Sequence, residues 1–141
     1  MKKIGLLGCG AIGTQIALAI DSGRIPGVLT HVYDSSKDAS IALVQKLKNK
    51  PEIVENPHLL SSHPVDIIVE AASQEAVRNV AHSVLQNKRD LMIMSVGALL
   101  DESIYDILSE ACEHFHKTIY LPSGAIAGLD AIKSVSTLLD S

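Results

Sequence analysis

Three glycines near the start of the chain have the spacing of a phosphate-binding turn. Gly8, Gly10 and Gly13 form the pattern G-x-G-x-x-G after the apolar segment "KKIGLL". The first glycine permits a tight bend, the second lets a pyrophosphate approach the backbone, and the third lets the next helix pack on the strand. That helix directs its free N–H groups and positive dipole end at the phosphates. The pattern therefore predicts binding of a dinucleotide.

An acidic residue lies where such a turn needs one. The motif predicts a carboxylate about 20 residues further on, at the end of the second strand, and Asp34 follows the apolar segment "VLTHVY". Its carboxylate can accept hydrogen bonds from the adenine ribose and would repel a 2′-phosphate, which favours NAD over NADP. Ser35, Ser36 and Lys37 weaken this preference, because they can host a phosphate if Asp34 turns away. The alternative is that Asp34 only caps a helix.

Three further predicted strands end in small residues. Ligands of open parallel sheets bind beyond the carboxyl ends of the strands, and small side chains there leave room for a flat ligand. Ordinary tight connections between strands and helices also favour small residues, so that alternative stays open. Glu70, at the end of a central strand, is either a buried carboxylate facing the cleft or a solvent-facing structural residue. The small residues that follow the three strands are Ala71–Ser73, Ser95–Gly97 and Pro122–Ala125.

The elements that must position these residues follow from the hydrophobic pattern. Short apolar runs alternate with amphipathic segments, which predicts a parallel, doubly wound α/β sheet. On the first helix, Ile12, Ile16, Ala19 and Ile20 form one apolar stripe. The segment 51–64 carries three prolines and is expected to hold one short strand and a turn. Helices are predicted over residues 11–22, 36–50, 74–87, 101–115 and 129–139.

Composition excludes several function classes. The net charge of -4 and the 3% aromatic residues provide neither a basic patch nor stacking platforms, so we expect no nucleic-acid or membrane partner. The six histidines show no ligand spacing, and Cys9 and Cys112 lie far apart, so no metal site is expected. Cys9 is interpreted as a packing residue rather than a reactive thiol. The apolar run before it, Ile4–Gly8, is shorter than the 7–15 residues of a signal core, and a reduced, cytoplasmic protein is expected.

Four segments resemble the L-aspartate dehydrogenase family of bacteria and archaea: "GLLGCGAIG", "VEAAS", "MSVGAL" and above all "YLPSGAIAGLDAIK". The resemblance runs from Ile4 to Lys133. It implies a Rossmann-type domain for NAD or NADP over residues 1–125, and the beginning of a catalytic domain over residues 126–141. The family oxidises L-aspartate to iminosuccinate, which can feed pyridine nucleotide biosynthesis. We expect this chain to bind the cofactor without turnover, because the resemblance places the catalytic residues after Ser141.

The resemblance also implies which residues contact each part of the cofactor. Asp34 is expected at the adenosine ribose. The last predicted helix has an unpartnered apolar face, so self-association into a homo-oligomer is expected. By match, the pyrophosphate lies along Gly10, Ala11 and Ile12, the nicotinamide ribose near Ala72 and Ser73, and the nicotinamide against Ser95, Gly97, Ser123, Gly124 and Ala125.

Three alternatives to this interpretation remain. The first is another NAD(P)-dependent dehydrogenase, which acts on homoserine or a sugar. The second is a regulatory module that senses NAD(H) without catalysis. The third alternative is a Rossmann-like domain that has lost its ligand.

Overall fold

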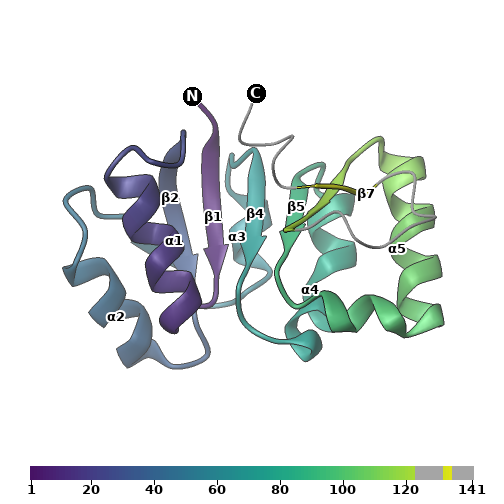
Figure 1. Ribbon diagram of the computed structural model, residues 1–141, viewed down its shortest axis with the longest axis horizontal. Helices are drawn as coiled ribbons and strands as arrows, with labels where there is room; N and C mark the ends of the chain where they lie inside the picture. Colours follow the sequence, from purple (N-terminus) through teal and green to yellow (C-terminus); the bar gives the residue numbers. More distant parts are fainter. Residues whose placement is uncertain (123–131, 135–141) are drawn as a thin grey trace.

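The structure, a computed structural model, describes residues 1–122 and 132–134. Its strands are all parallel and form one sheet in the order β3-β2-β1-β4-β5-β6-β7. The chain first builds outward from β1 to β3, then returns to place β4 on the other side of β1 (Figure 1). This confirms the predicted α/β, doubly wound sheet. The strands are β1 Lys3–Leu7, β2 Val28–Tyr33, β3 Glu52–Ile53, β4 Ile67–Glu70, β5 Asp90–Ile93, β6 Ile119–Leu121 and β7 Ile132–Ser134.

Three of the helices begin at a side chain that caps them. The hydroxyls of Ser36 and Ser73 and the carboxylate of Asp101 each accept a hydrogen bond from a backbone N–H of the first turn, which satisfies groups that have no partner inside the helix. The proline-bearing segment forms β3 and the short α3. The helices are α1 Ala11–Asp21, α2 Lys37–Gln45, α3 Leu59–Ser62, α4 Gln74–Gln86 and α5 Glu102–Phe115, with a 3₁₀ helix, η1, over Val96–Leu100.

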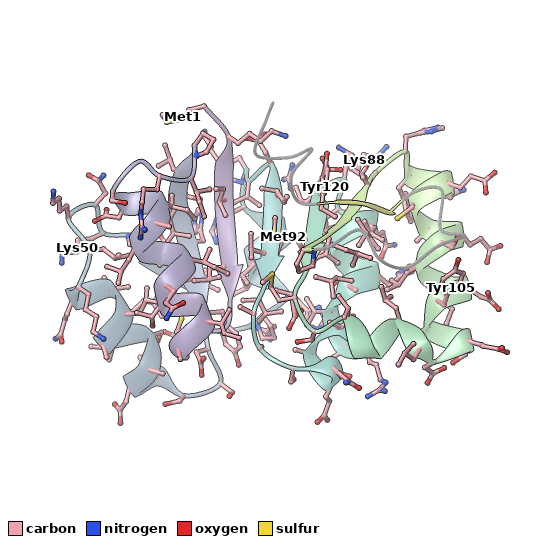
Figure 2. All side chains as sticks on the ribbon, viewed as in Figure 1. Met1, Lys50, Lys88, Met92, Tyr105 and Tyr120 are labelled. Atoms are coloured by element: carbon pink, nitrogen blue, oxygen red, sulfur yellow. The ribbon has the colours of Figure 1, made fainter. Side chains whose placement is uncertain are left out.

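The helices cover the sheet in two layers, and the alternation of side chains along each strand separates two cores. On β4, Ile67 and Val69 pack with α1 and α2, whereas Ile68 packs with α3, α4 and α5. In Figure 1, α1 lies in front of the sheet and α4 behind it. Charged side chains such as Lys50 and Lys88 extend from the outside of the molecule (Figure 2). The fold thus leaves the edge beyond the carboxyl ends of the strands for a ligand.

Three sequence predictions need correction. The predicted helix over 129–139 is wrong at Ile132–Ser134, which pairs with β6 as a strand, and its other residues lie outside the described part. Pairing with β6 satisfies backbone groups along that strand's edge, a long-range gain that helical periodicity does not register. The predicted stripe on α1 is wrong at Ile12, which is 56% exposed, and α2 ends at Gln45 rather than near Lys50. None of the helices in the described residues combines the length and apolar character needed to span a membrane.

Candidate functional site

The glycine turn connects β1 to α1 and leaves its middle residue bare. Gly8 has a φ of 108°, which favours glycine, and a Cβ there would lie 2.5 Å from the Ala71 carbonyl oxygen. A Cβ on Gly13 would collide with the Gly8 carbonyl oxygen, whereas one on Gly10 would meet no heavy atom within 4 Å. Two glycines are therefore required by packing. Gly10 instead keeps the backbone open to an approaching group.

The N-terminus of α1 has no side-chain cap, unlike those of α2, α4 and α5. The first helical hydrogen bond runs from Thr14 N–H to the Gly10 carbonyl at 2.8 Å, so the amides of Ala11 and Ile12 precede the helical ladder. The exposed apolar side chain of Ile12 lies at the same end. These amides and the helix dipole together form an environment that suits an anion.

Asp34, the residue after β2, accepts hydrogen bonds from the backbone of the glycine turn and also lines a pocket beside it. One carboxylate oxygen accepts a hydrogen bond from Cys9 N–H at 2.7 Å, and the other accepts one from Ser36 N–H at 2.8 Å. Each carboxylate oxygen can accept more than one hydrogen bond, so Asp34 keeps capacity for a ribose hydroxyl. The Ser36 hydroxyl is used to cap α2, and Lys37 pairs with Glu55 at 3.4 Å. Two of the three residues that weakened the preference for NAD are thus already engaged.

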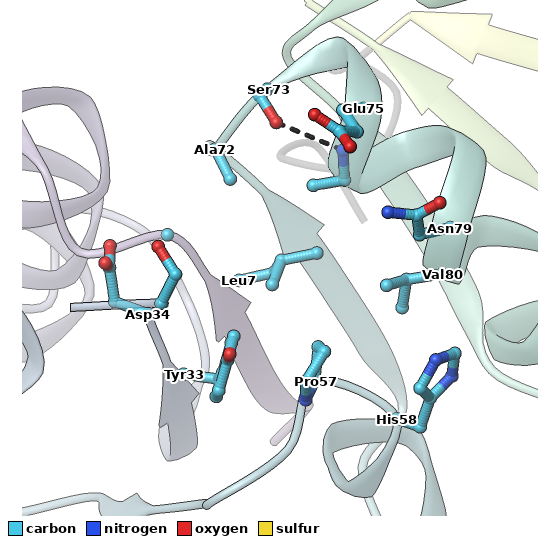
Figure 3. Close-up of a pocket in the computed structure, with 13 residues that line it drawn as sticks. Leu7, Tyr33, Asp34, Pro57, His58, Ala72, Ser73, Glu75, Asn79 and Val80 are labelled. Atoms are coloured by element: carbon cyan, nitrogen blue, oxygen red, sulfur yellow. Dashed lines mark hydrogen bonds between the residues drawn. The ribbon is translucent and has the colours of Figure 1, made fainter. Parts of the chain in front are cut away.

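A pocket of about 560 Å³ opens beside the turn, between β1, β2 and α4. Tyr33 and Asp34 lie on one side of it, and Asn79 and Val80 of α4 lie on the other (Figure 3). Apolar side chains form much of its wall, together with the carboxylates of Asp34 and Glu75, which is the usual make-up of a small-molecule site. Of the predicted site residues, it brings together Gly8, Asp34, Ala72 and Ser73.

Some residues of this pocket were missed by the sequence analysis. Pro57 and His58 come from the segment between β3 and α3, and His58 Nδ1 lies 3.1 Å from the Ser83 hydroxyl oxygen. Glu75, Ala76 and Asn79 line the wall because the first two turns of α4 begin at the pocket. No short motif marks these residues. The packing of α4 on β4 and β5 brings its residues to the site, and the segment after β3 brings Pro57 and His58.

Of the remaining predicted site residues, those at positions 10–13 and those after β5 do not line the pocket, and three others lie outside the described residues. Ser95 follows β5, and both its N–H and its hydroxyl donate to Glu70. A Cβ on Gly97 would meet the side-chain amide nitrogen of Gln74, the movable end of a flexible side chain, so packing by itself does not require a glycine there. Contacts of Ser95 and Gly97 with nicotinamide remain predictions. Ser123, Gly124 and Ala125 lie outside the described residues.

Cys9, inside the turn, is a packing residue, in agreement with the interpretation from the sequence. Its side chain is 5% exposed and belongs to the core under α1 and α2. Burial, and then the charge of Asp34, raise the pKa of the Cys9 thiol to about 12. Because the thiolate is the reactive form, the thiol is inert at neutral pH.

Comparison with known proteins decides the family. The family described as "Homoserine dehydrogenase, NAD binding domain" matches residues 8–122, which include the glycine turn, Asp34 and the loops after β4 and β5. The chain belongs to this family of NAD-binding domains. The prediction of a nicotinamide dinucleotide as cofactor is thereby confirmed at the level of the family.

The NAD-binding domain is also similar to named proteins. It is 77% identical over its whole length to an L-aspartate dehydrogenase of Nitrosopumilus maritimus, and 43% identical over 96% of its length to one of Methanocella arvoryzae. The chain spans 52% and 50% of these relatives, about half their length. The predicted resemblance to L-aspartate dehydrogenases is confirmed. A probable dehydrogenase from Thermotoga maritima shares the fold, with a TM-score of 0.75 and 21% identity over 84% of this chain and 35% of that one.

A second group of polar side chains lies at the outer edge of the NAD-binding domain, near β3. His31, Glu52 and His63 bring one potential metal-ligand atom each within 4.8 Å of the others. The two imidazole rings are stacked, with centroids 4.1 Å apart and planes 15° apart. Lone pairs lie in the ring planes, so near-parallel rings do not direct two nitrogens at one ion. The absence of a metal site stays a prediction from the sequence.

Because of the stacked pair His31 and His63, we expect the free energy of unfolding to depend on pH. Burial, and then the neighbouring His63, lower the pKa of His31, while Glu52 acts in the opposite direction. The unfolded chain therefore binds the proton more readily, so the free energy of unfolding falls as pH drops below the ordinary histidine pKa of about 6.5. We expect His31→Gln to reduce the loss of stability between about pH 7.5 and 5.5 in urea unfolding.

His82→Gln, at an exposed position on α4, is the control and should keep the wild-type pH dependence. An unchanged pH dependence in His31→Gln would show that the stacked pair does not contribute.

Proposed function

We propose that this chain binds NAD(H) as the cofactor domain of an L-aspartate dehydrogenase. The observation that carries this proposal is the bare backbone at Gly10, two residues after Gly8, which lines a pocket with the Asp34 carboxylate on its wall. The family match and the 77% identity to an L-aspartate dehydrogenase support it. We propose NAD rather than NADP, because the Asp34 carboxylate faces the place where a 2′-phosphate would lie.

The residues of the chain fit each part of the cofactor. The open space at Gly10 and the uncapped start of α1 suit the pyrophosphate. The side chains of Leu7, Tyr33 and Val80 give the pocket apolar walls for adenine, and Asp34 has acceptors for the ribose hydroxyls. Ala72 and Ser73 extend from this pocket toward β5, the direction in which we place the nicotinamide half. When bound, nicotinamide supplies a hydride acceptor, and the protein contributes binding and orientation.

The proposal also covers the domains, substrate, oligomeric state and location of the whole protein. We propose residues 1–125 as the cofactor domain and residues 126–141 as the beginning of a second domain, with β7 linking the two through its pairing with β6. L-Aspartate as substrate, iminosuccinate as product, a homo-oligomer and a cytoplasmic location are proposed on the same basis. The relatives' names support the substrate.

Calorimetric titration of the chain with NADH tests the cofactor. We expect saturable binding, and at a concentration about 100-fold above the Kd a stabilisation of about 2.7 kcal/mol against unfolding. NADPH, the matched ligand, should bind about tenfold more weakly or worse, because its 2′-phosphate meets the Asp34 carboxylate. The absence of both heat and thermal shift with either coenzyme would contradict the proposal.

An activity assay on a protein that contains this chain and has the full length of the relatives tests the substrate. L-Aspartate should reduce NAD, and L-homoserine should not. Reduction of NAD by L-homoserine alone would instead assign the domain to a homoserine dehydrogenase.

A further inference from the structure

Glu70 is the most deeply buried charged side chain in the described residues. It ends β4, is 1% exposed, and lies on the face of the sheet that α4 covers. A carboxylate buried in this way is unfavourable unless other groups compensate its charge or saturate its oxygens. None of the ion pairs among the described residues includes Glu70. Its burial must therefore be compensated by hydrogen bonds alone.

Four donors surround the carboxylate, and they come from two different loops. One oxygen accepts from Ala72 N–H at 2.8 Å and from the Ser95 hydroxyl at 2.7 Å. The other oxygen accepts from Ser95 N–H at 2.9 Å and from Met94 N–H at 3.1 Å. Glu70 thus ties the loop after β4 to the loop after β5, across two neighbouring strands.

A carboxylate satisfies the whole set. All four partners donate in the observed arrangement, and an ionised carboxylate accepts at both oxygens. A glutamine of the same shape would turn its NH₂ group toward one pair of donors. The Ser95 hydroxyl can accept instead of donating, and Met94 N–H also donates to the Glu70 main-chain carbonyl at 3.1 Å. One backbone N–H, of Ala72 or of Ser95, would still lose its partner, which costs more than losing an exposed hydrogen bond. The site therefore selects for an acceptor-only side chain, which apolar packing under α4 does not require.

The loops that Glu70 joins lie at the edge where the cofactor is proposed to bind. Ala72 lines the pocket beside Asp34, so the carboxylate contacts the backbone of the pocket wall from behind. Ser95 follows the next strand along the sheet, on the side away from the adenosine pocket. We propose that Glu70 is a positioning residue that fixes both loops for the nicotinamide half of the dinucleotide. This inference rests on the proposed NAD(H) function.

A comparison of NADH binding with ADP binding distinguishes a positioning role of Glu70 from a general effect on the stability of the fold. With the full chain, we expect Glu70→Gln to weaken NADH binding about tenfold or more while ADP binding changes less than about twofold. ADP retains the adenosine and pyrophosphate contacts but lacks the nicotinamide half. Glu110→Gln, at an exposed position on α5, should behave as wild type with both ligands.

Ser95→Ala is the second variant, because it removes one donor without burying a new polar group. We expect it to weaken NADH binding about threefold, again without effect on ADP, and it decides the question if Glu70→Gln does not fold. Equal loss of NADH and ADP binding, or no loss of either, would overturn the positioning role. Failure of the wild-type chain to bind NADH and ADP would instead remove the proposed function, and the inference with it.

Discussion

Gly10→Ala is expected to leave the chain folded and to weaken NADH binding about tenfold or more. An added Cβ at Gly10 meets no protein atom within 4 Å, so it enters the space that we assign to the pyrophosphate. Alanine is a poorer N-cap than glycine, and this costs about 1 kcal/mol of stability or less. Binding, rather than folding, should therefore be lost, as calorimetry and urea unfolding of the same preparation will show.

Gly13→Ala is the matched variant, with the same added methyl group three residues further on. Here the new Cβ collides with the Gly8 carbonyl oxygen, and neither backbone segment can move without separating α1 from β1. Overpacking of this kind typically lowers the free energy of unfolding by about 1–3 kcal/mol. We expect a value near the upper end of this range, because the clashing atom belongs to the backbone. We expect a clear fall in the urea midpoint. Wild-type NADH affinity in Gly10→Ala would contradict our assignment of the pyrophosphate site.

Asp34→Asn is expected to reverse much of the preference for NADH over NADPH. The substitution removes the negative charge opposite a 2′-phosphate and weakens the acceptors for the ribose hydroxyls. Hydrogen bonds to charged groups contribute about 1.5–3 kcal/mol, so the ratio of the two affinities should change about tenfold or more. Fluorescence titration with both coenzymes measures this ratio directly.

Glu75→Gln is the control for this experiment, because Glu75 is a second carboxylate on the wall of the same pocket. It belongs to α4 rather than to the turn after β2, and it should leave the coenzyme preference unchanged. Asp34 also accepts a hydrogen bond from Cys9 N–H, so Asp34→Asn is expected to lower stability slightly. Equal binding of NADH and NADPH by the wild-type chain would remove the basis of the prediction.

The predictions from the sequence agree best with the structure where they concern interactions between residues close together in the chain. The strand, turn and helix around Gly8 and Gly13 follow from the spacing of the glycines, because each helix turn and each tight bend involves residues only a few positions apart. Helix starts near residues 36 and 101 were predicted for the same reason, and in the structure Ser36 and Asp101 cap these helices. Asp34 was found by its spacing from the turn, although its bond to Cys9 was not.

Other features depended on which segments meet in space. His58 and Asn79 line the pocket from separate elements. The hydrophobic period of neither segment predicts that the two residues lie close together. Residues 132–134 pair with β6 although their own pattern is that of a helix. For Glu70 the sequence left both a buried and a solvent-facing position open, since the last residue of a strand can face either environment.

The sequence by itself determined the order of the main strands and helices up to β6, the dinucleotide turn and the carboxylate at Asp34, since these are encoded in local spacing and hydrophobic period. Only the tertiary structure decided that Gly10 opens onto free space while Gly13 is filled, that α4 forms one wall of the pocket, and that Glu70 holds two loops together. These outcomes depend on contacts between segments far apart in the chain. Their energies arise from packing and desolvation, which become defined only when the sheet assembles.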